Sequence, residues 1–257
     1  MPKHTNNLRI NEMNKLKKLL LSLSIATIIL GGMACSKEDS ANQVDNHGTP
    51  NLSDAISSKG KEQAAIAAMP QGNADTPLNQ YKELTSDNDI MFAYYALSSI
   101  PVDYDKVLIS YSEDYRRASD EFKKQDILNA LKPKIDQEIA AAKNARYLKM
   151  TWNGFRLNKY DFPAKGFPQD SLGNNSNLGW DNYGYRLAFT NGDNYKLFKV
   201  EDEAKARLIE EKRSKHEQFD LVVYVYAQDA DLNNKSVKTQ VMHVSLIDSR
   251  GNELFAQ

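Results

Sequence analysis

The sequence predicts an α+β fold in which N-terminal helices pack on a largely antiparallel β-sheet. Apolar residues recur at helical spacing between about residues 86 and 142. From about residue 147, aromatic and β-branched residues alternate with polar ones between turn residues, which is typical of strands. The chain has 257 residues, 41% of them hydrophobic, so it is long enough to bury one core.

Two helices are predicted before residue 118. Ser86, Asp87 or Asn88 can cap a helix that runs to Leu97, because short polar side chains accept hydrogen bonds from the free N–H groups of a first turn. Asp103 can cap the next helix in the same way. The apolar face of this second helix comprises Val107, Leu108, Tyr111 and Tyr115.

The longest predicted helix begins after Ser119 or Asp120 and runs to about Ala142. Its apolar stripe comprises Phe122, Leu128, Leu131, Ile135 and Ile139. Pro133 lies inside this stripe, so either one helix is kinked there or two helices meet there. The stripe keeps its phase across the proline, which favours a single kinked helix.

Strands follow the helices. We expect them around Tyr147–Trp152, Phe155–Tyr160 and Tyr185–Phe189, and Asn191-Gly192 has the composition of a hairpin turn. A charged helix from Glu201 to about Lys215 comes next, with its inward face formed by Ala204, Ala206 and Leu208.

Two long strands close the chain. They cover Leu221–Ala227 and Val237–Ile247, and they are joined by a polar loop, 229–235. The turn 249–252 then leads to an apolar end that contains Leu254 and Phe255.

An export signal precedes the domain. Residues 1–35 are predicted to be a signal peptide whose true start is Met13, because Lys15, Lys17 and Lys18 precede the apolar run Leu19–Leu30. That run is shorter than the roughly 20 residues needed to span a bilayer, so a cleaved signal is favoured over a transmembrane helix.

Cys35 is the predicted lipidation site. Gly32-Met33-Ala34-Cys35 resembles the lipobox of bacterial lipoproteins, in which a small residue precedes an acylated cysteine, although Gly32 stands where that family usually has Leu. Cys35 is the only cysteine of the chain, which excludes an intramolecular disulfide. The alternative is an ordinary secretory signal with an incidental cysteine. Ser36 follows, and the resemblance then implies an outer membrane lipid anchor facing the periplasm or the surface.

Residues 36–77 are predicted to be a flexible tether, because they are polar and contain few large apolar side chains. Within them, Ala64–Met69 has the composition of a short, marginal helix. A single α+β domain is expected over residues 78–257. The net charge of −1 gives no indication of a nucleic-acid partner.

No metal site, cofactor or catalytic motif is predicted. His216 and His243 lack neighbouring ligands at metal spacing. Asp229, Asp231 and Asn233 imitate the start of a calcium loop, but Asn234 stands where that loop requires Gly, so a solvated hairpin loop is the better interpretation.

The aromatic stretch 160–168 and the loop that follows it form the candidate ligand-binding region. Its aromatic residues are Tyr160, Phe162, Phe167 and Trp180. Exposed aromatic rings beside amide side chains can bind glycans or peptides. The alternative, which we favour from sequence alone, is that Phe162, Phe167 and Trp180 close one end of the core.

Two segments carry a resemblance to a known family. Asp120–Pro133 (DEFKKQDILNALKP) and Tyr160–Pro168 (YDFPAKGFP) resemble a family of proteobacterial lipoproteins with a domain of unknown function. The resemblance implies a lipid-anchored envelope protein and brings no catalytic residues.

These observations lead to two main hypotheses, and a passive structural component or surface antigen is a third possibility. The first is a non-enzymatic, lipid-tethered binding or assembly module of the cell envelope, whose partner is an envelope protein or a glycan besides the membrane itself. The second is a periplasmic hydrolase whose site is assembled from distant carboxylates.

Overall fold

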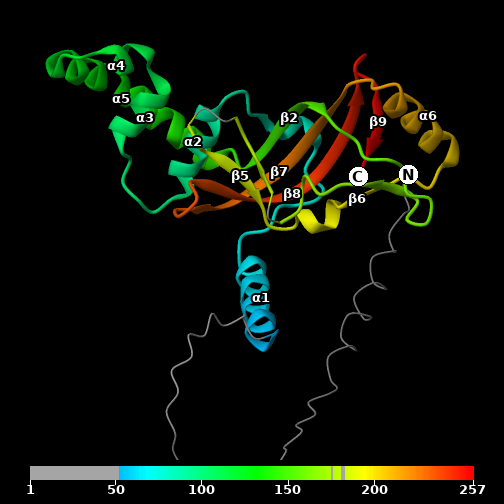
Figure 1. The fold of residues 1–257 in the computed structure, drawn as a ribbon. Coiled ribbons are helices and arrows are strands. Elements are labelled where there is room, and N and C mark those ends of the chain that lie inside the picture. The colour runs from blue at the N-terminus through cyan, green and yellow to red at the C-terminus, as the bar shows by residue number, and fades with distance from the viewer. Residues whose placement is uncertain (1–51, 175, 181–182) are drawn as a thin grey trace, which may run out of the picture. The chain divides into compact units, whose positions relative to one another are not determined.

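The computed structural model describes residues 52–174, 176–180 and 183–257, which fall in one compact unit, Pro50–Gln257 (Figure 1). The fold is α+β, as predicted, and its sheet is mixed but largely antiparallel. The predicted signal peptide, Cys35 and the start of the predicted tether lie outside the described residues.

Seven strands form the main sheet in the order β1-β2-β7-β8-β5-β4, with β9 also paired to β8. The pairs β1–β2 and β5–β8 are parallel, and the other pairs are antiparallel. The strands are β1 (Lys82–Glu83), β2 (Tyr147–Phe155), β4 (Asn177–Leu178), β5 (Arg186–Phe189), β7 (Phe219–Asp231), β8 (Ser236–Asp248) and β9 (Glu253–Ala256). A separate two-stranded sheet pairs β3 (Gly166–Pro168) with β6 (Leu197–Lys199).

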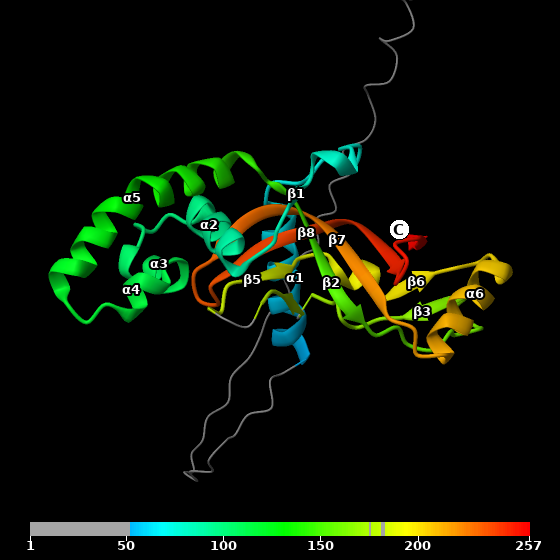
Figure 2. The same ribbon diagram turned by 90° about the horizontal axis from the view of Figure 1, so that it is seen from above.

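The helices are not confined to the N-terminal part, because β1 precedes most of them and one helix follows β6. They are α1 (Leu52–Ala67), α2 (Asp87–Leu97), α3 (Tyr104–Tyr111), α4 (Glu113–Arg117), α5 (Glu121–Asn144) and α6 (Glu203–Ser214), with short 3₁₀ turns η1 (Leu78–Gln80) and η2 (Gly192–Tyr195). Helix α2 packs on β7 and β8 and also against α5, and α3, α4 and α5 pack on one another beyond the end of the sheet (Figure 2).

The predicted helix caps are confirmed. Asp103 and Asp120 each accept a hydrogen bond from the backbone three residues on, at 3.1 and 3.0 Å. Ser86 caps α2, and the Asp89 carboxylate accepts from the Ser86 N–H at 3.1 Å. The predicted second helix is in fact two, because Ser112 caps a new helix and its hydroxyl accepts from the Tyr115 N–H.

Helix α5 is one helix that runs through Pro133, as favoured from the sequence. Ile135 is completely buried, but Phe122, which the sequence placed on the same stripe, is 86% exposed. The two residues are 13 positions apart, and at about 100° per residue they lie about 140° apart around the helix. Phe122 therefore cannot share the buried face.

The prediction of a hairpin at Asn191-Gly192 is wrong. Gly192 begins η2, and the following strand β6 pairs with β3 rather than returning along β5. Gly192 is required for a different reason, because a Cβ there would lie only 1.5 Å from the Leu172 carbonyl oxygen. The predicted strand Phe155–Tyr160 is also wrong beyond Phe155, where β2 ends.

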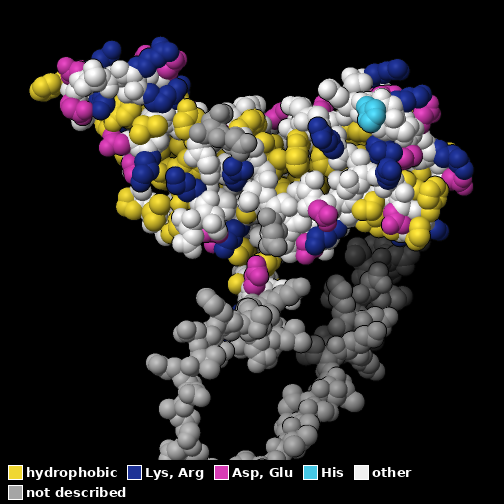
Figure 3. Space-filling view, in the orientation of Figure 1, with side chains coloured by type: hydrophobic (Ala, Val, Ile, Leu, Met, Phe, Trp, Pro, Cys, Tyr) yellow, Lys and Arg dark blue, Asp and Glu magenta, His cyan; other side chains and the backbone are white. Residues whose placement is uncertain are grey.

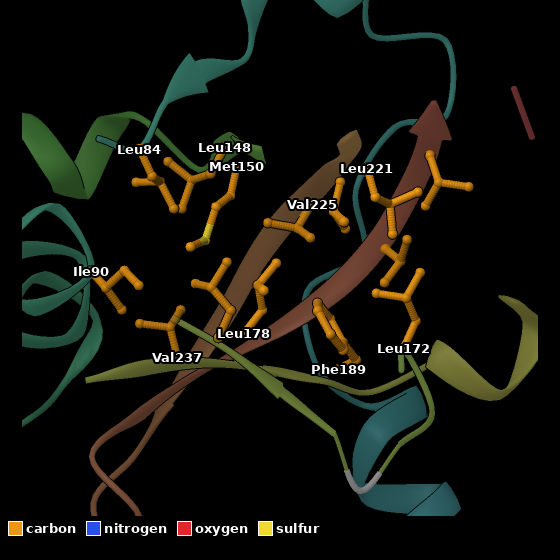
Figure 4. Close-up of a cluster of buried hydrophobic side chains, with 14 of the residues drawn as sticks. Leu84, Ile90, Leu148, Met150, Leu172, Leu178, Phe189, Leu221, Val225 and Val237 are labelled. Carbon is orange, nitrogen blue, oxygen red and sulfur yellow. The ribbon is translucent and has the colours of Figure 1, made fainter. Parts of the chain in front are cut away.

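The two long C-terminal strands form the centre of the sheet. β7 and β8 pair antiparallel from Phe219↔Asp248 to Asp231↔Ser236, which confirms the predicted hairpin. Their core side chains meet those of β2, β4 and β5 and the buried residues of α2 (Figure 4). Gly251, at a φ of 82°, makes the predicted turn into β9.

Helix α6 buries a different face from the one predicted. Ala206 and Ile209 are buried, whereas Ala204 is exposed and Leu208 is 47% exposed. Ala206 and Ile209 are three positions apart, so they lie on one face of the helix, and this is the face that packs on the domain. The pairs Glu203–Arg207 and Glu211–Lys215 are exposed to solvent, whereas the Lys212 side chain is mostly buried and contacts Asp248 at 3.3 Å.

Part of the predicted tether is structured. Helix α1 is 16 residues long, well beyond the short helix expected at Ala64–Met69. After it, the Gln228 side chain donates to the Pro70 carbonyl at 3.0 Å, and the Gly72 N–H donates to the Gln240 side chain at 2.9 Å. The backbone of Pro70 and Gly72 is therefore hydrogen-bonded to side chains of the sheet. No described helix combines the length and apolar character needed to cross a bilayer.

Candidate functional site

The aromatic stretch folds into a tight hairpin, residues 161–166, which we call the Phe162 hairpin. Asp161 and Gly166 exchange two backbone hydrogen bonds, at 2.8 and 3.3 Å. The Asp161 carboxylate also accepts from the Ala164 N–H at 3.0 Å. Lys165 completes the turn at a φ of 52°, a left-handed conformation that non-glycine residues rarely adopt. These bonds hold the hairpin tip in one conformation.

Phe162 stands out from the hairpin with 81% of its surface exposed. Its ring meets the Tyr160 ring edge to face, with centroids 5.2 Å apart. Tyr160 is half-buried, and its hydroxyl donates to the Val200 carbonyl at 3.0 Å, so Tyr160 is fixed at the base of the hairpin. A phenylalanine left in water gains none of the roughly 1.5–3 kcal/mol that burial would give, so the exposed ring contributes little to the stability of the free protein.

A groove of about 720 Å³ separates the Phe162 hairpin from α6. Its lining residues are Tyr160, Phe162, Lys165, Glu201, Glu203, Ala206, Arg207, Glu210, Glu211 and Ser214. At the α6 end of the domain, hydrophobic side chains lie beside charged ones of both signs (Figure 3). The groove therefore combines an aromatic wall with a charged helical wall.

The charged wall is internally compensated. Each lining glutamate contacts a cation: Glu201 with Lys199 at 2.7 Å, Glu203 with Arg207 at 2.6 Å, Glu210 with Arg213 at 2.6 Å, and Glu211 with Lys215 at 2.5 Å. These cations hold the pKa values of Glu201, Glu210 and Glu211 below their usual range. All three carboxylates are consequently ionised near neutral pH.

Glu210 connects the two walls. Its carboxylate accepts a pair of hydrogen bonds from the Arg213 guanidinium, at 2.8 and 2.6 Å, and a third from the Tyr160 N–H at 3.3 Å. Both the position of Tyr160 and the orientation of α6 therefore depend on this carboxylate.

The structure brings together two of the four aromatic residues predicted for ligand binding. Tyr160 and Phe162 line the groove. Phe167 does not, because its side chain is 1% exposed and β3 places it in the core. Trp180 packs against the core as a partly buried residue and does not line the groove. Cys35, the predicted lipidation site, lies outside the described residues.

Sequence reasoning missed the helical wall. The sequence predicts a charged helix from Glu201 to about Lys215 with a solvated face, but it does not predict that the Phe162 hairpin lies beside this helix. The missing information was the pairing of β3 with β6, in which Phe167 lies opposite Phe198 and which carries the hairpin alongside α6. β3 and β6 are about 30 residues apart, and no local sequence pattern predicts that they pair.

Other candidates have structural roles. The Asp231 carboxylate accepts from the Asn233 N–H and the Asn234 side chain, at 3.0 and 2.9 Å, as expected of a hairpin loop. His243 contacts the Ser245 hydroxyl at 3.2 Å, and burial lowers the pKa of its imidazole. Within the described ranges, no three His, Cys, Asp or Glu side chains are grouped to hold a metal ion.

Ser245 is not arranged as a nucleophile. Its side chain is buried, at 3% exposure for the residue, and its hydroxyl donates to the Glu253 carboxylate at 2.9 Å. A triad requires the histidine to lie between serine and carboxylate, whereas here the serine lies between the other two.

Comparisons of the chain with models of known protein families, with curated proteins and with solved structures give no match. The resemblance to the proteobacterial lipoprotein family therefore stays a prediction.

Proposed function

We propose that this protein is a lipid-anchored component of the bacterial cell envelope that binds a partner, without catalysis, through the groove between the Phe162 hairpin and α6. The observation that carries the proposal is the exposed Phe162 ring, held by a rigid hairpin at the wall of a groove. The volume of the groove lies within the range of about 300–1,000 Å³ typical of ligand sites.

The cost of the arrangement supports a binding role. Lys165 holds a left-handed backbone conformation, which typically costs about 1–3 kcal/mol, and Phe162 is left in water by the same hairpin. Strained backbone conformations of this kind cluster at binding sites, active sites and switch regions.

The electrostatics favour binding over the alternative of a periplasmic hydrolase. A general acid at neutral pH needs a raised carboxyl pKa. In the groove, the neighbouring cations lower the pKa values of Glu201, Glu210 and Glu211. These groups are thus unsuited to donating a proton, and they are well suited to accepting hydrogen bonds from a ligand.

The anchor is proposed from the sequence. Cys35, preceded by the apolar run Leu19–Leu30, would carry the lipid, and Ser36 favours the outer membrane. Two or more acyl chains are needed for stable attachment. Mass spectrometry of the mature N-terminus tests this part: we expect an acylated Cys35, and an unmodified Cys35 or cleavage elsewhere would contradict it.

Cross-linking in intact cells tests the binding role. The wild-type chain is compared with Phe162→Ala, with Cys35→Ala, and with Leu208→Ala as a matched control. Leu208 is another exposed apolar side chain, at 47%, but it does not line the groove. We expect one captured partner with the wild-type chain and Leu208→Ala, and its loss with Phe162→Ala and Cys35→Ala. Equal capture by Phe162→Ala and the wild-type chain would refute the proposed site.

A further inference from the structure

We infer that the groove takes an uncharged oligosaccharide, an inference that rests on the binding role proposed above. The argument depends on three features of the groove. The carboxylates of its lining glutamates are already paired with cations of this chain, its aromatic ring is open to solvent, and the backbone of its hairpin wall is hydrogen-bonded within the chain.

Charge compensation selects against a charged ligand. The four lining glutamates, Glu201, Glu203, Glu210 and Glu211, each lie within 2.7 Å of a cation of this chain. A cationic ligand would compete with those cations, and an anionic ligand would meet four carboxylates against two lining cations, Lys165 and Arg207. A neutral ligand leaves every ion pair in place. We therefore expect the ligand to carry no net charge.

The same ion pairs present oriented hydrogen-bonding groups. A carboxylate has about four lone-pair sites and a guanidinium five N–H donors, so the two hydrogen bonds from Arg207 to one Glu203 oxygen leave capacity on both side chains. Glu203 and Arg207 are each 77% exposed while paired with one another. Sugar hydroxyl groups both donate and accept hydrogen bonds, so they can use a carboxylate and its neighbouring guanidinium together.

Phe162 supplies the apolar contact. Its ring is held edge to face with Tyr160, at an interplanar angle of 85°, and its exposure is 81%. One face of a pyranose ring is formed by C–H groups, and such a surface packs on an aromatic ring. The exposed Phe162 ring can therefore pack on the C–H face of a sugar while the neighbouring polar groups bond its hydroxyl groups.

A peptide fits this groove less well. Strand addition requires unpaired backbone groups at a sheet edge. Here the backbone of the Phe162 hairpin is hydrogen-bonded within the chain, because Asp161 and Gly166 are bonded to one another and the Lys165 carbonyl accepts from the Val200 N–H at 2.9 Å. A helical peptide requires a row of apolar positions, whereas Tyr160, Phe162 and Ala206 are the only apolar residues that line the groove.

The experiment measures binding of the full chain to an immobilised panel of neutral and acidic oligosaccharides of defined sequence. Phe162→Ala removes the stacking ring, and Leu208→Ala is the matched surface control. Because Phe162 is 81% exposed, the variant should fold like the wild-type chain, which urea denaturation checks. The strongest neutral binder is then titrated at low and high salt, because salt screens exposed charges but not stacking.

The inference predicts binding to neutral members of the panel, a loss of at least about tenfold with Phe162→Ala, and a change of less than about twofold with Leu208→Ala. The affinity should change less than about twofold between 0.05 and 0.5 M salt. Binding only to acidic members, with a steep salt dependence, would overturn the inference, and so would binding to no member.

The two proposals fail differently. If no oligosaccharide binds but cross-linking in cells captures a protein in a Phe162-dependent manner, the ligand class is wrong and the binding role stands. If neither the panel nor the cross-linking depends on Phe162, both proposals are wrong.

Discussion

Alanine substitutions of Phe162 and Phe167 should have opposite consequences, although the two residues lie five positions apart in one aromatic stretch. Phe167 is 1% exposed, its ring contacts Tyr160 at 5.1 Å, and it lies opposite Phe198 in the β3–β6 pair. Truncating a fully buried phenylalanine costs about 3–5 kcal/mol, because the transfer energy is lost and a cavity remains. Phe162 is 81% exposed, so its truncation should change stability by less than about 0.5 kcal/mol.

Thermal and urea denaturation measure the difference. For a domain of this size, 1 kcal/mol corresponds to about 2–4 °C, so Phe167→Ala should lower the melting temperature by about 6–20 °C. Phe162→Ala should leave it within about 2 °C and abolish Phe162-dependent cross-linking. If both variants lost similar stability, Phe162 would be a core residue and the candidate site would not exist.

Three further substitutions test other parts of the structure. Gly192→Ala places a Cβ 1.5 Å from the Leu172 carbonyl oxygen, so soluble yield and the circular dichroism signal should fall sharply; a wild-type melting curve would show that the packing is wrong. Pro133 lies inside the single helix α5, so Pro133→Ala restores a backbone N–H donor and should raise the urea midpoint. A lowered midpoint would contradict a continuous helix at this position. Backbone N–H groups of Asn252 and Arg250 hold the pKa of Asp248 well below its usual range. A depressed carboxyl pKa gives stability above the unfolded value of about 3.9 that is lost as the pH falls below it. Asp248→Asn should therefore lower the urea midpoint at pH 7 and flatten its decline below about pH 4; an unchanged pH profile would contradict this role.

Local features of the fold were predictable because they depend on nearby residues. Asp103 and Asp120 cap helices through bonds to the backbone three positions on, so the sequence alone locates them. The β7–β8 hairpin was equally clear, since its strands alternate strongly and are joined by a short polar loop. A helix cap involves fewer than about five residues, and strand alternation repeats along one strand, so both can be recognised locally.

Features set by distant contacts were not predictable. β1 pairs in parallel with β2 across about 65 residues, and β6 pairs with β3 across about 30, without any turn signal to join them. The same reason limits prediction of the candidate site. Phe162 and Phe167 lie in one aromatic stretch, and only the β3–β6 pairing decides which of them is buried. The sequence predicts α6 as a charged helix, which is correct. It does not predict that α6 lines a groove, because the other wall comes from a distant part of the chain.

The central claim is that a ligand occupies the groove between the Phe162 hairpin and α6, and neighbouring positions on α6 test it most directly. Arg207 lines the groove, whereas Leu208 is the next residue and does not. A photo-reactive side chain is placed at each position in turn, and the chain is irradiated in intact cells. The account predicts a covalent adduct at position 207 and none, or far less, at position 208. Equal labelling at both positions, or labelling at 208 alone, would contradict it.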